Sequence, residues 1–193
     1  KWSEARHLAY TLNTAQYNAV YWISPDNNRM LIRGAFINGA FHGKGVSMVQ
    51  LQSNGRWSEP RGLNIKNYYK YDCGLQSGAS MSHDGKTLLL YMSPEEGSPV
   101  NDLFVCFKKE ECCWTEPKSL GKMINLPGNN EMTPYLASDG VTLYFSSDGP
   151  GGYGDNDIWM TKRLDDSWQK WSMPVNLGSP INTPEWDALF TMD

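Results

Sequence analysis

Several common features are missing from this sequence, and each absence narrows its function. No apolar run approaches the roughly 18 residues that a membrane-spanning helix needs. Lys and Arg number 17 against 21 Asp and Glu, and a net charge of −4 disfavours binding to a nucleic acid. The chain also lacks a nucleophile motif, a phosphate-binding loop and the cysteine–histidine spacing of a zinc site. We therefore expect no membrane span, no nucleic-acid partner, no catalytic residues, no cofactor and no metal.

An internal repeat is the most informative feature that is present. Tryptophans open similar segments at spacings of 55, 57 and 57 residues, at Trp2, Trp57, Trp114 and Trp171. A second series consists of aspartates in turn-like sequences, at Asp26, Asp84, Asp139 and Asp193. A third series lies eight residues before each aspartate, at Asn18, Gln76, Glu131 and Glu185. Three series with one period indicate a repeat architecture.

Each period contains short strand-like runs and no helical periodicity. In the third period the expected strands are 133–137, 141–146, 157–163 and 168–177. The clearest strands of the second period are 87–92 and 102–107, and those of the first are 29–32 and 46–51. Dipeptides typical of tight hairpins separate strands at Asp84-Gly85, Asp139-Gly140 and Asn54-Gly55.

Four antiparallel strands in each period predict an all-β fold, a β-propeller of four-stranded blades. A small sheet cannot bury both of its faces alone, so each blade needs a neighbour to stack against. We expect the last strand of a preceding blade at 1–16, whole blades at 17–67, 68–124 and 125–182, and the first strand of a following blade at 183–193. The alternative, a β-sandwich with accidental similarity between its halves, has no need of three phased series.

The tryptophan and aspartate series have structural interpretations. Each tryptophan begins a fourth strand and is expected to pack between blades, with stacking on a ligand as the alternative role. Each aspartate lies in the turn between the first and second strands, where a short carboxylate accepts backbone N–H bonds and fixes the turn. Equivalent aspartates of different blades would lie around a ring, so a catalytic carboxylate pair is not expected.

The third series is the candidate interaction site. Its members, Asn18, Gln76, Glu131 and Glu185, open the first strand of each blade, which is the strand nearest the axis of a propeller. They are therefore predicted to form a polar ring at the mouth of the central channel. Because two of them are anionic, the ring suits a cation or a basic peptide. The alternative is a polar lining that water satisfies.

A glycine-rich loop near 148–157 is the most motif-like stretch. Its Asp148, Asp155 and Asp157 offer oxygen ligands, and Ca²⁺ takes several carboxylates. The spacing of an EF-hand is absent, and the glycines more simply permit an extended loop between the second and third strands, with Asp157 as its cap. Calcium is the weaker of these two interpretations.

The cysteines do not follow the repeat. All four lie in the second period, at Cys73, Cys106, Cys112 and Cys113. If Lys109 and Glu110 form the centre of a hairpin, Cys106 faces Cys113 across the strands. That pair is then either a disulfide or two reduced thiols.

The third period also resembles a known repeat family. The residues that carry the resemblance are Glu131-Met132-Thr133-Pro134, the run from Ser138 to Asp148, Gly151-Gly152-Tyr153-Gly154, Asp157-Ile158-Trp159 and the run from Trp171 to Thr183. They are similar to the WD40-like, TolB-type β-propeller repeat, in the version found in envelope proteins of Bacteroidota such as PorE-type, OmpA-associated propellers. The resemblance covers nearly the whole chain but is close only in the third period. The first period departs most, with Asp26-Asn27-Asn28 in place of Asp-Gly.

This resemblance implies a non-catalytic scaffold in the periplasm, associated with the outer membrane, that binds protein partners of an envelope complex. A type IX secretion or gliding-type assembly is one such complex. The tetratricopeptide and OmpA-like domains that accompany these propellers are not among the 193 residues, so peptidoglycan binding is not assigned. The alternative is a carbohydrate-binding or carbohydrate-active propeller, sialidase-like or lyase-like, because aromatic residues such as Trp22, Tyr153 and Trp186 suit stacking on sugars. The arginines, however, are scattered over non-equivalent blade positions.

The repeat accounts for three whole blades and one strand at each end of the sequence. A closed propeller typically needs at least four blades. We therefore expect the remaining propeller blades to come from residues outside this sequence.

Overall fold

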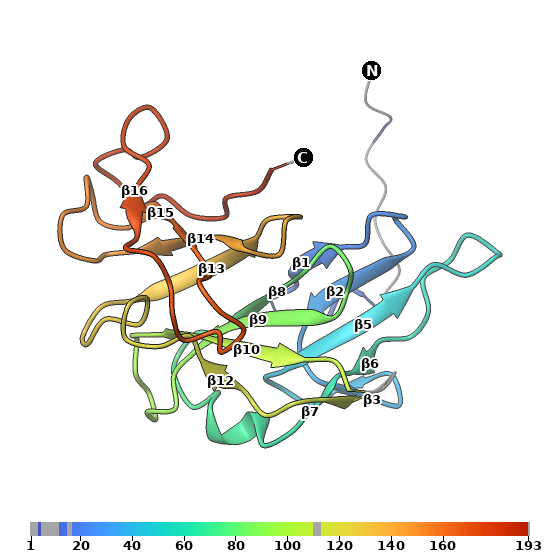
Figure 1. The fold of residues 1–193 in the computed structure, drawn as a ribbon. Helices are drawn as coiled ribbons and strands as arrows, with labels where there is room; N and C mark the ends of the chain where they lie inside the picture. Colours follow the sequence, from blue (N-terminus) through green and yellow to red (C-terminus); the bar gives the residue numbers. More distant parts are fainter. Residues whose placement is uncertain (1–3, 5–11, 15–16, 110–112, 193) are drawn as a thin grey trace. The chain divides into compact units, whose positions relative to one another are not determined.

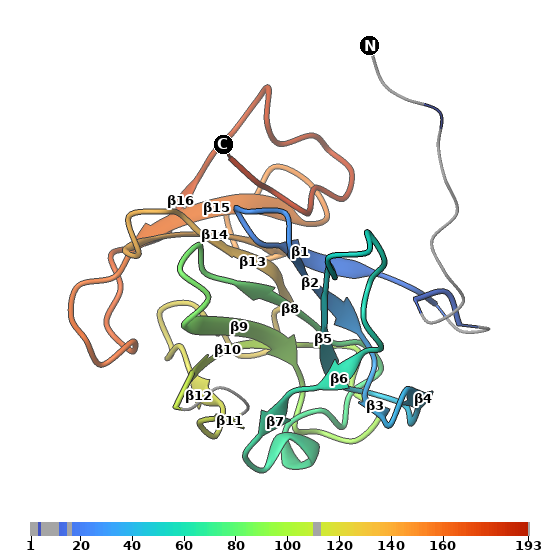
Figure 2. The same cartoon turned by 90° about the vertical axis from the view of Figure 1, so that its right-hand side faces the viewer.

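A computed structural model describes residue 4 and residues 12–14, 17–109 and 113–192 (Figures 1 and 2). Regular structure in these residues is β-strand, apart from one short 3₁₀ helix, η1 (Tyr68–Lys70). The predicted all-β class is therefore confirmed. Within the same residues, no helix has the length and hydropathy to cross a membrane. The chain divides into two compact units, Lys1–Leu63 and Asn64–Asp193, which are described separately below.

Unit 1 contains one four-stranded antiparallel sheet, sheet 1, with the order β1-β2-β5-β6. Its strands are β1 (Val20–Ile23), β2 (Arg29–Arg33), β5 (Val46–Gln50) and β6 (Arg61–Gly62). Between β2 and β5 lies a hairpin that we did not predict, β3 (Phe36–Ile37) with β4 (Ala40–Phe41). Asn38 and Gly39 both have positive φ, the backbone of a tight hairpin turn. Phe36 joins a small core with Leu12, Met30, Ile32 and Val49, against which Trp57 packs.

Unit 2 contains two four-stranded antiparallel sheets (Figure 1). The strands of sheet 2 are β8 (Gly78–Met81), β9 (Thr87–Met92), β10 (Asp102–Phe107) and β12 (Lys118–Ser119). The strands of sheet 3 are β13 (Glu131–Leu136), β14 (Thr142–Ser147), β15 (Asp157–Lys162) and β16 (Val175–Asn176). In both sheets each strand pairs with the next one along the chain, apart from a separate parallel pair, β7 (Asn64–Ile65) with β11 (Cys113–Trp114). This order is that of a propeller blade.

The fourth strand of each sheet is shorter than the sequence predicts. In sheet 3 the expected run 168–177 yields only Val175–Asn176, and Trp171 forms an isolated bridge with Arg163. Pro174 separates the two, and a proline has no N–H to donate to the ladder. Trp57 and Trp114 form the equivalent bridges in the other sheets. β9 and β10, by contrast, have the predicted bounds.

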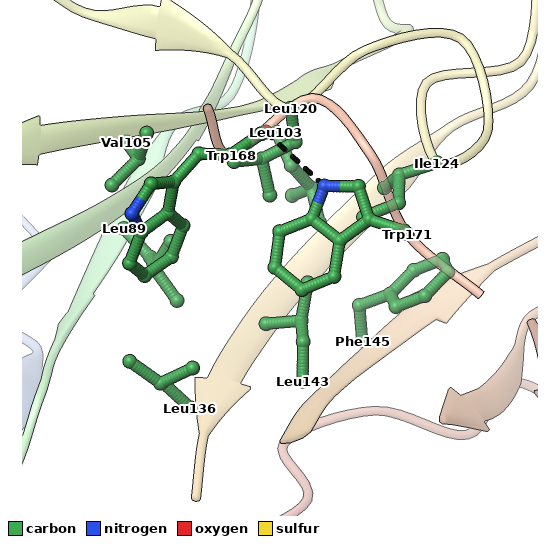
Figure 3. Close-up of a cluster of buried hydrophobic side chains, with 10 residues drawn as sticks. All are labelled: Leu89, Leu103, Val105, Leu120, Ile124, Leu136, Leu143, Phe145, Trp168 and Trp171. Carbon is green, nitrogen blue, oxygen red and sulfur yellow. Dashed lines mark hydrogen bonds between the residues drawn. The ribbon is translucent and has the colours of Figure 1, made fainter. Parts of the chain in front are cut away.

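A hydrophobic core joins the two sheets of unit 2 (Figure 3). Strand β13 of sheet 3 packs across β8, β9 and β10 of sheet 2. The buried side chains are Leu89, Leu103, Val105, Leu120, Ile124, Leu136, Leu143, Phe145, Trp168 and Trp171. The Trp171 indole N–H donates a 3.1 Å hydrogen bond to the backbone carbonyl of Trp168, which fixes the Trp171 ring within this core. Unit 2 is therefore a pair of stacked blade-like sheets.

Strand register places equivalent side chains in one row across each sheet. The rows are Trp22, Leu31, Met48 and Arg61 in sheet 1; Ser80, Leu89, Val105 and Lys118 in sheet 2; and Tyr135, Tyr144, Met160 and Val175 in sheet 3. Leu89 and Val105 point into the core toward sheet 3. In sheet 3, Leu143 and Phe145 point toward sheet 2. Tyr144 alternates with them, so its row lies on the opposite side of the sheet, which we call the far face.

Residues near the C-terminus lie on this far face of sheet 3. The Phe190 ring stacks on Tyr144 at 4.5 Å between centroids and meets the Tyr135 ring at 6.5 Å. The Tyr135 hydroxyl donates to the Met192 carbonyl over 2.8 Å. We predicted a strand at 183–193, but residues 183–192 form only one isolated bridge, between Trp186 and Asn156. The described residues thus show three blade-like sheets, and a closed propeller stays a proposal.

Candidate functional site

The tryptophan series is structural where it is described. Trp171 is 3% exposed and lies in the core between sheets 2 and 3. Trp114 is 4% exposed, and its strand β11 pairs with β7. Trp57 is partly buried against the core of unit 1. Trp2 lies outside the described residues. Trp114 and Trp171 are therefore enclosed, and Trp57 packs against a core with part of its surface still exposed.

The aspartate series fixes turns through hydrogen bonds. Asp84 Oδ1 accepts from the Ser82 hydroxyl at 2.6 Å and from the Lys86 N–H at 3.0 Å, and the Ser82 oxygen accepts from the Thr87 N–H. The Ser82 hydroxyl holds the pKa of Asp84 below its ordinary value. Asp26 accepts in the same way from the Ser24 hydroxyl and the Asn28 N–H.

Asp139 also fixes its turn, but without a serine partner. Its carboxylate accepts from the N–H groups of Val141 and Thr142, each at 2.8 Å, and from the Thr142 hydroxyl at 2.7 Å. The Thr142 N–H lowers the pKa of Asp139. Asp193, the fourth member, lies outside the described residues.

Three members of the predicted polar ring are at or near the surface. Asn18 forms a local turn in unit 1, where its side chain bonds the backbone of Thr14 in both directions. Gln76 is exposed just before β8. Glu185 is exposed in the segment after β16, and its N–H donates to the Thr183 hydroxyl.

Glu131 differs from the accessible residue that the sequence predicts, because its side chain is 0% exposed. Its backbone N–H donates to the Asn101 carbonyl of sheet 2 at 2.9 Å, and its Oε1 accepts from the Ser147 hydroxyl of β14 at 3.2 Å. The residue is enclosed because the start of β13 is held against both sheets. Glu131 therefore supports the junction of sheets 2 and 3 from within.

Glu131, Ser147 and Asp157 form a buried row across β13, β14 and β15. Their exposed fractions are 0%, 3% and 1%. Among the described residues, Glu131 Oε2 and Asp157 Oδ1 have no hydrogen-bond partner. Burial, with smaller contributions from the nearby charges of Asp102 and Asp148, raises the pKa of Glu131 to about 8. At neutral pH the Glu131 carboxyl is therefore largely protonated.

The three calcium candidates do not gather at one point. Asp148 Oδ1 accepts from the Asn130 N–H at 2.7 Å and the Asn129 side-chain amide at 3.2 Å. Asp157 turns inward, where its Oδ2 accepts from the Tyr153 N–H and from the Asn176 side chain, and so closes the loop. Asp155 is exposed. In the described part of the chain, no three Asp, Glu, His or Cys side chains are arranged to hold a metal ion.

The assumed hairpin register, in which Cys106 faces Cys113, is wrong, and the disulfide that was one of the two predicted states does not form. Cys73 and Cys106 are free thiols, and Cys112 lies outside the described residues. The Lys109 N–H donates to the Cys113 carbonyl, and the Thr115 N–H donates to the Phe107 carbonyl. In this register the position opposite Cys106 is three residues beyond Cys113. The two sulfur atoms therefore do not face each other, and burial raises the pKa of the Cys106 thiol.

Two asparagines that sequence reasoning missed hold the third strands of unit 2. Asn125 accepts from the Leu103 N–H and donates to the Leu103 carbonyl, both at 2.9 Å. Asn182 makes the same pair of bonds with Ile158, at 2.8 and 3.1 Å. These amides replace the fourth strand where it has ended. The signal was present, because Leu-Gly-x-x-Ile-Asn ends at both positions, 57 residues apart.

One end of sheet 3 is acidic. We name this acidic end by its exposed carboxylates, Asp148, Asp155 and Glu185, in loops that adjoin the starts of β13 and β15. No Lys or Arg occurs at 123–161 or at 172–193. The basic residues of this sheet lie at its other end, where Arg163 pairs with Asp166 at 2.7 Å and Lys170 with Asp165 at 3.3 Å. The acidic end therefore has no neutralising base of its own.

Two exposed aromatic side chains stand at the acidic end, Tyr153 at 58% and Trp186 at 53%. They come from two segments that lie against each other, since the Asp187 N–H donates to the Asn156 carbonyl at 2.7 Å. A Cβ at Gly154 would clash with the Thr183 carbonyl, so only glycine permits this approach. The acidic end with Tyr153 and Trp186 is the candidate interaction surface.

Comparisons with known proteins add little to this description. No family model matches the chain, and no curated protein matches its sequence. One solved structure that is similar is prolyl oligopeptidase B from Galerina marginata, bound to a 35mer hydrolysis and macrocyclization substrate. It shares 16% sequence identity at a TM-score of 0.45, over 83% of this chain and 20% of that one. The chain thus spans about a fifth of that protein's length, and a likeness this low supports neither a fold nor an activity.

Proposed function

We propose that the chain is a non-catalytic β-propeller module that binds a protein partner in the bacterial cell envelope. The observation that carries the proposal is the acidic end of sheet 3, where Tyr153 and Trp186 stand exposed beside carboxylates that no base neutralises. Tyr and Trp are enriched at protein interfaces because they bury a large area at small entropic cost. A carboxylate cluster steers a partner of opposite charge.

The surroundings of this surface suit a scaffold. Asp157, Asp148 and Asn182 fix the adjoining loops through backbone hydrogen bonds, so Tyr153 and Trp186 project from a frame that is already ordered. An ordered frame lowers the cost of binding. The two groups whose chemistry is most perturbed, Glu131 and Cys106, are both enclosed and do not reach a substrate.

The envelope location belongs to the same proposal and comes from the resemblance of residues 131–183. It includes the periplasm, association with the outer membrane, a type IX secretion or gliding-type complex, and further blades supplied by residues outside this sequence. The acidic end fits such a role because a scaffold needs a surface that is distinct in charge from the rest of its blade.

Capture from an envelope extract tests the proposed function. The full chain serves as bait, and retained proteins are quantified by mass spectrometry for the wild type and for Tyr153→Ser with Trp186→Ser. We expect the double variant to lose at least one protein that the wild type retains. Tyr69→Ser is the matched control, because Tyr69 is 73% exposed but lies in η1, away from the acidic sequence segments.

Two results would overturn the proposal. One is equal capture by the wild type, the double variant and the control. The other is glycan-array binding, or cleavage of a glycan, that the double variant abolishes, which would favour the carbohydrate alternative instead.

A further inference from the structure

Two segments of unit 2 come together at the acidic end and bring exposed side chains with them. Asn156 and Trp186 form an isolated parallel bridge, and the Asp187 N–H donates to the Asn156 carbonyl at 2.7 Å. A Cβ at Gly154 would lie 2.8 Å from the Glu185 carbonyl oxygen, so the loop before Asn156 also touches the second segment. The residues next to these contacts therefore share one small area of surface.

Four exposed side chains belong to this area, two aromatic rings and two carboxylates. Tyr153 and Trp186 are 58% and 53% exposed, and Asp155 and Glu185 are exposed as well. Asp155 and Glu185 each precede one residue of the Asn156–Trp186 bridge, so they are neighbours across the two segments. Within the part of the chain that the structure describes, neither carboxylate forms an ion pair. We call these four residues the Trp186 patch.

Hydrogen bonds hold both segments in place. The Asp187 carboxylate accepts from the Thr183 N–H at 2.6 Å, and the Asp187 carbonyl accepts from the Ser146 hydroxyl at 2.6 Å. In the other segment, the Tyr153 N–H donates to the buried Asp157 carboxylate. A surface that is ordered before binding loses little conformational entropy when a partner binds.

The other end of sheet 3 shows what a tryptophan beside a carboxylate binds in this chain. There the Arg163 guanidinium lies over the Trp168 ring, 4.7 Å from its centroid, and pairs with the Asp166 carboxylate at 2.7 Å. A guanidinium suits both neighbours, because it is planar, stacks on aromatic faces and donates in a fork to carboxylates. Arginine, tryptophan and carboxylate thus form one packed unit.

The Trp186 patch has the tryptophan and the carboxylates of such a unit but lacks the base. No Lys or Arg occurs at 123–161 or at 172–193. The first base after the glycine-rich loop, Lys162, ends β15, whereas the patch adjoins the start of this strand. A partner that supplies a guanidinium would therefore complete the arrangement that Arg163 completes at the other end.

We propose that the Trp186 patch binds an arginine side chain of a protein partner, with the guanidinium on the Trp186 ring and its N–H groups directed to Asp155 and Glu185. This proposal rests on the proposed function and names the side chain that the partner contributes. Arginine is favoured over lysine, because the ammonium of lysine is a strongly hydrated point charge without a planar face.

Fluorescence anisotropy with labelled 12-residue peptides and the full chain tests the proposal. Three peptides repeat Gly-Ser-X, where X is Arg, Lys or citrulline, the neutral isostere of Arg. We expect the Arg peptide to bind, the Lys peptide to bind at least threefold more weakly, and the citrulline peptide to bind at least tenfold more weakly. This order separates recognition of a guanidinium from attraction of charge alone.

Two variants divide the patch into its charges and its ring. Asp155→Asn with Glu185→Gln keeps the shape and should weaken binding of the Arg peptide at least fivefold. Trp186→Leu should weaken it at least threefold and abolish the preference for Arg over Lys. Glu95→Gln with Glu96→Gln is the matched control, because these carboxylates are also exposed in unit 2 but have no aromatic residue beside them in the sequence. The control should bind as the wild type does, and circular dichroism verifies that each variant folds.

Several outcomes would overturn the proposal. Equal binding of the Arg and Lys peptides to the wild type, or full binding by the Trp186→Leu variant, would show that the surface attracts charge without recognising a guanidinium. No binding of the Arg peptide to the wild type would overturn it as well. So would a loss in the Glu95 and Glu96 control as large as that in the Asp155 and Glu185 variant.

Capture from envelope extract separates failure of this inference from failure of the proposed function. If Asp155→Asn with Glu185→Gln keeps a protein that the Tyr153 and Trp186 double variant loses, the arginine inference is wrong and the proposed function stands. If the wild type and all variants capture the same proteins, the proposed function itself fails. Loss of the same protein from both variants, together with the preference for the Arg peptide, supports both.

Discussion

Sheet 2 and sheet 3 have the same strand order, yet the equivalent face is fully buried in sheet 2 and only partly buried in sheet 3. In sheet 2, Leu89 and Val105 are 0% exposed because sheet 3 covers them. In sheet 3, the equivalent Tyr144 and Met160 are only partly buried. The row ends in Lys118 in one sheet and in Val175 in the other. The comparison shows that the burial of a blade is decided by its neighbour, as expected for stacked repeats.

The far face of sheet 3 is covered by a few side chains instead of a sheet. Phe190 stacks on Tyr144, but Leu189 is 78% exposed and Met192 is 51% exposed in the same segment. Strand β13 makes the corresponding contact with sheet 2 as part of a complete blade. This difference is why we propose that a further blade, from outside this sequence, completes the contact on sheet 3.

Truncation of matched core positions should give the largest difference between the two faces. Leu89→Ala removes a fully buried side chain and should lower the free energy of unfolding by ~2–5 kcal/mol. Met160→Ala, in the equivalent row of sheet 3, should cost less, about 1–2 kcal/mol, because this side chain is only partly buried. Urea unfolding of the full chain measures both, with hydrogen exchange at β9 and β15 to identify the unit that opens. Equal costs would show that the far face is as well covered as the core.

The pH dependence of stability should distinguish Glu131 from its repeat equivalent, Glu185. The pKa of Glu131 is about 8 in the folded chain, against about 4.3 for an unfolded glutamate. The folded state therefore holds the extra proton, so the stability is complete below about pH 4.3 and falls as pH rises through 8. The slope should approach about 1.4 kcal/mol per pH unit between these limits.

Glu131→Gln should remove this slope, as measured by urea unfolding at pH 5.5, 7 and 9. Glu185→Gln, at the exposed equivalent position, should leave the wild-type slope unchanged. A Glu131→Gln variant with the full slope would mean that another group titrates at the junction of the two sheets.

Asn125 and Asn182, which hold the third strands of sheets 2 and 3, should stabilise the fold to a similar degree whether or not a neighbouring sheet covers their own sheet. Asn125→Ala leaves the Leu103 N–H and carbonyl without partners, and Asn182→Ala does the same to Ile158. Each substitution should cost ~1–3 kcal/mol, because unsatisfied buried backbone groups lose their hydrogen bonds. Asn129→Ala, whose side chain bonds Asp148 at the surface, is the control and should cost less than either. If Asn182→Ala hardly changed the free energy of unfolding, the contribution of this asparagine would depend on a neighbouring sheet stacked on its own.

The sequence predicted local features better than contacts between sheets. The runs Thr87–Met92 and Asp102–Phe107 and the turn aspartates follow from alternation, β-branched residues and Asp-Gly dipeptides, which act within a few residues. The burial of Glu131 depends on Asn101, 30 residues away and just before β10 of sheet 2, and no local pattern encodes that packing. The error over Cys106 and Cys113 arose because the hairpin centre sets the register, and a small shift of that centre moves the residue opposite Cys106 by three positions.

The outer edges of the two sheets should give the smallest effect on stability. Met173→Glu with Val175→Lys changes two exposed side chains, and surface substitutions typically alter the free energy of unfolding by no more than about 0.5 kcal/mol. The reverse exchange in sheet 2, Glu116→Met with Lys118→Val, removes the Glu116 contacts with Lys66 and the Tyr71 hydroxyl and should cost about 1 kcal/mol. Urea midpoints of the two variants measure this contrast. A large loss for the sheet 3 exchange would mean that Met173 and Val175 pack within the fold, whereas a small one agrees with their exposure.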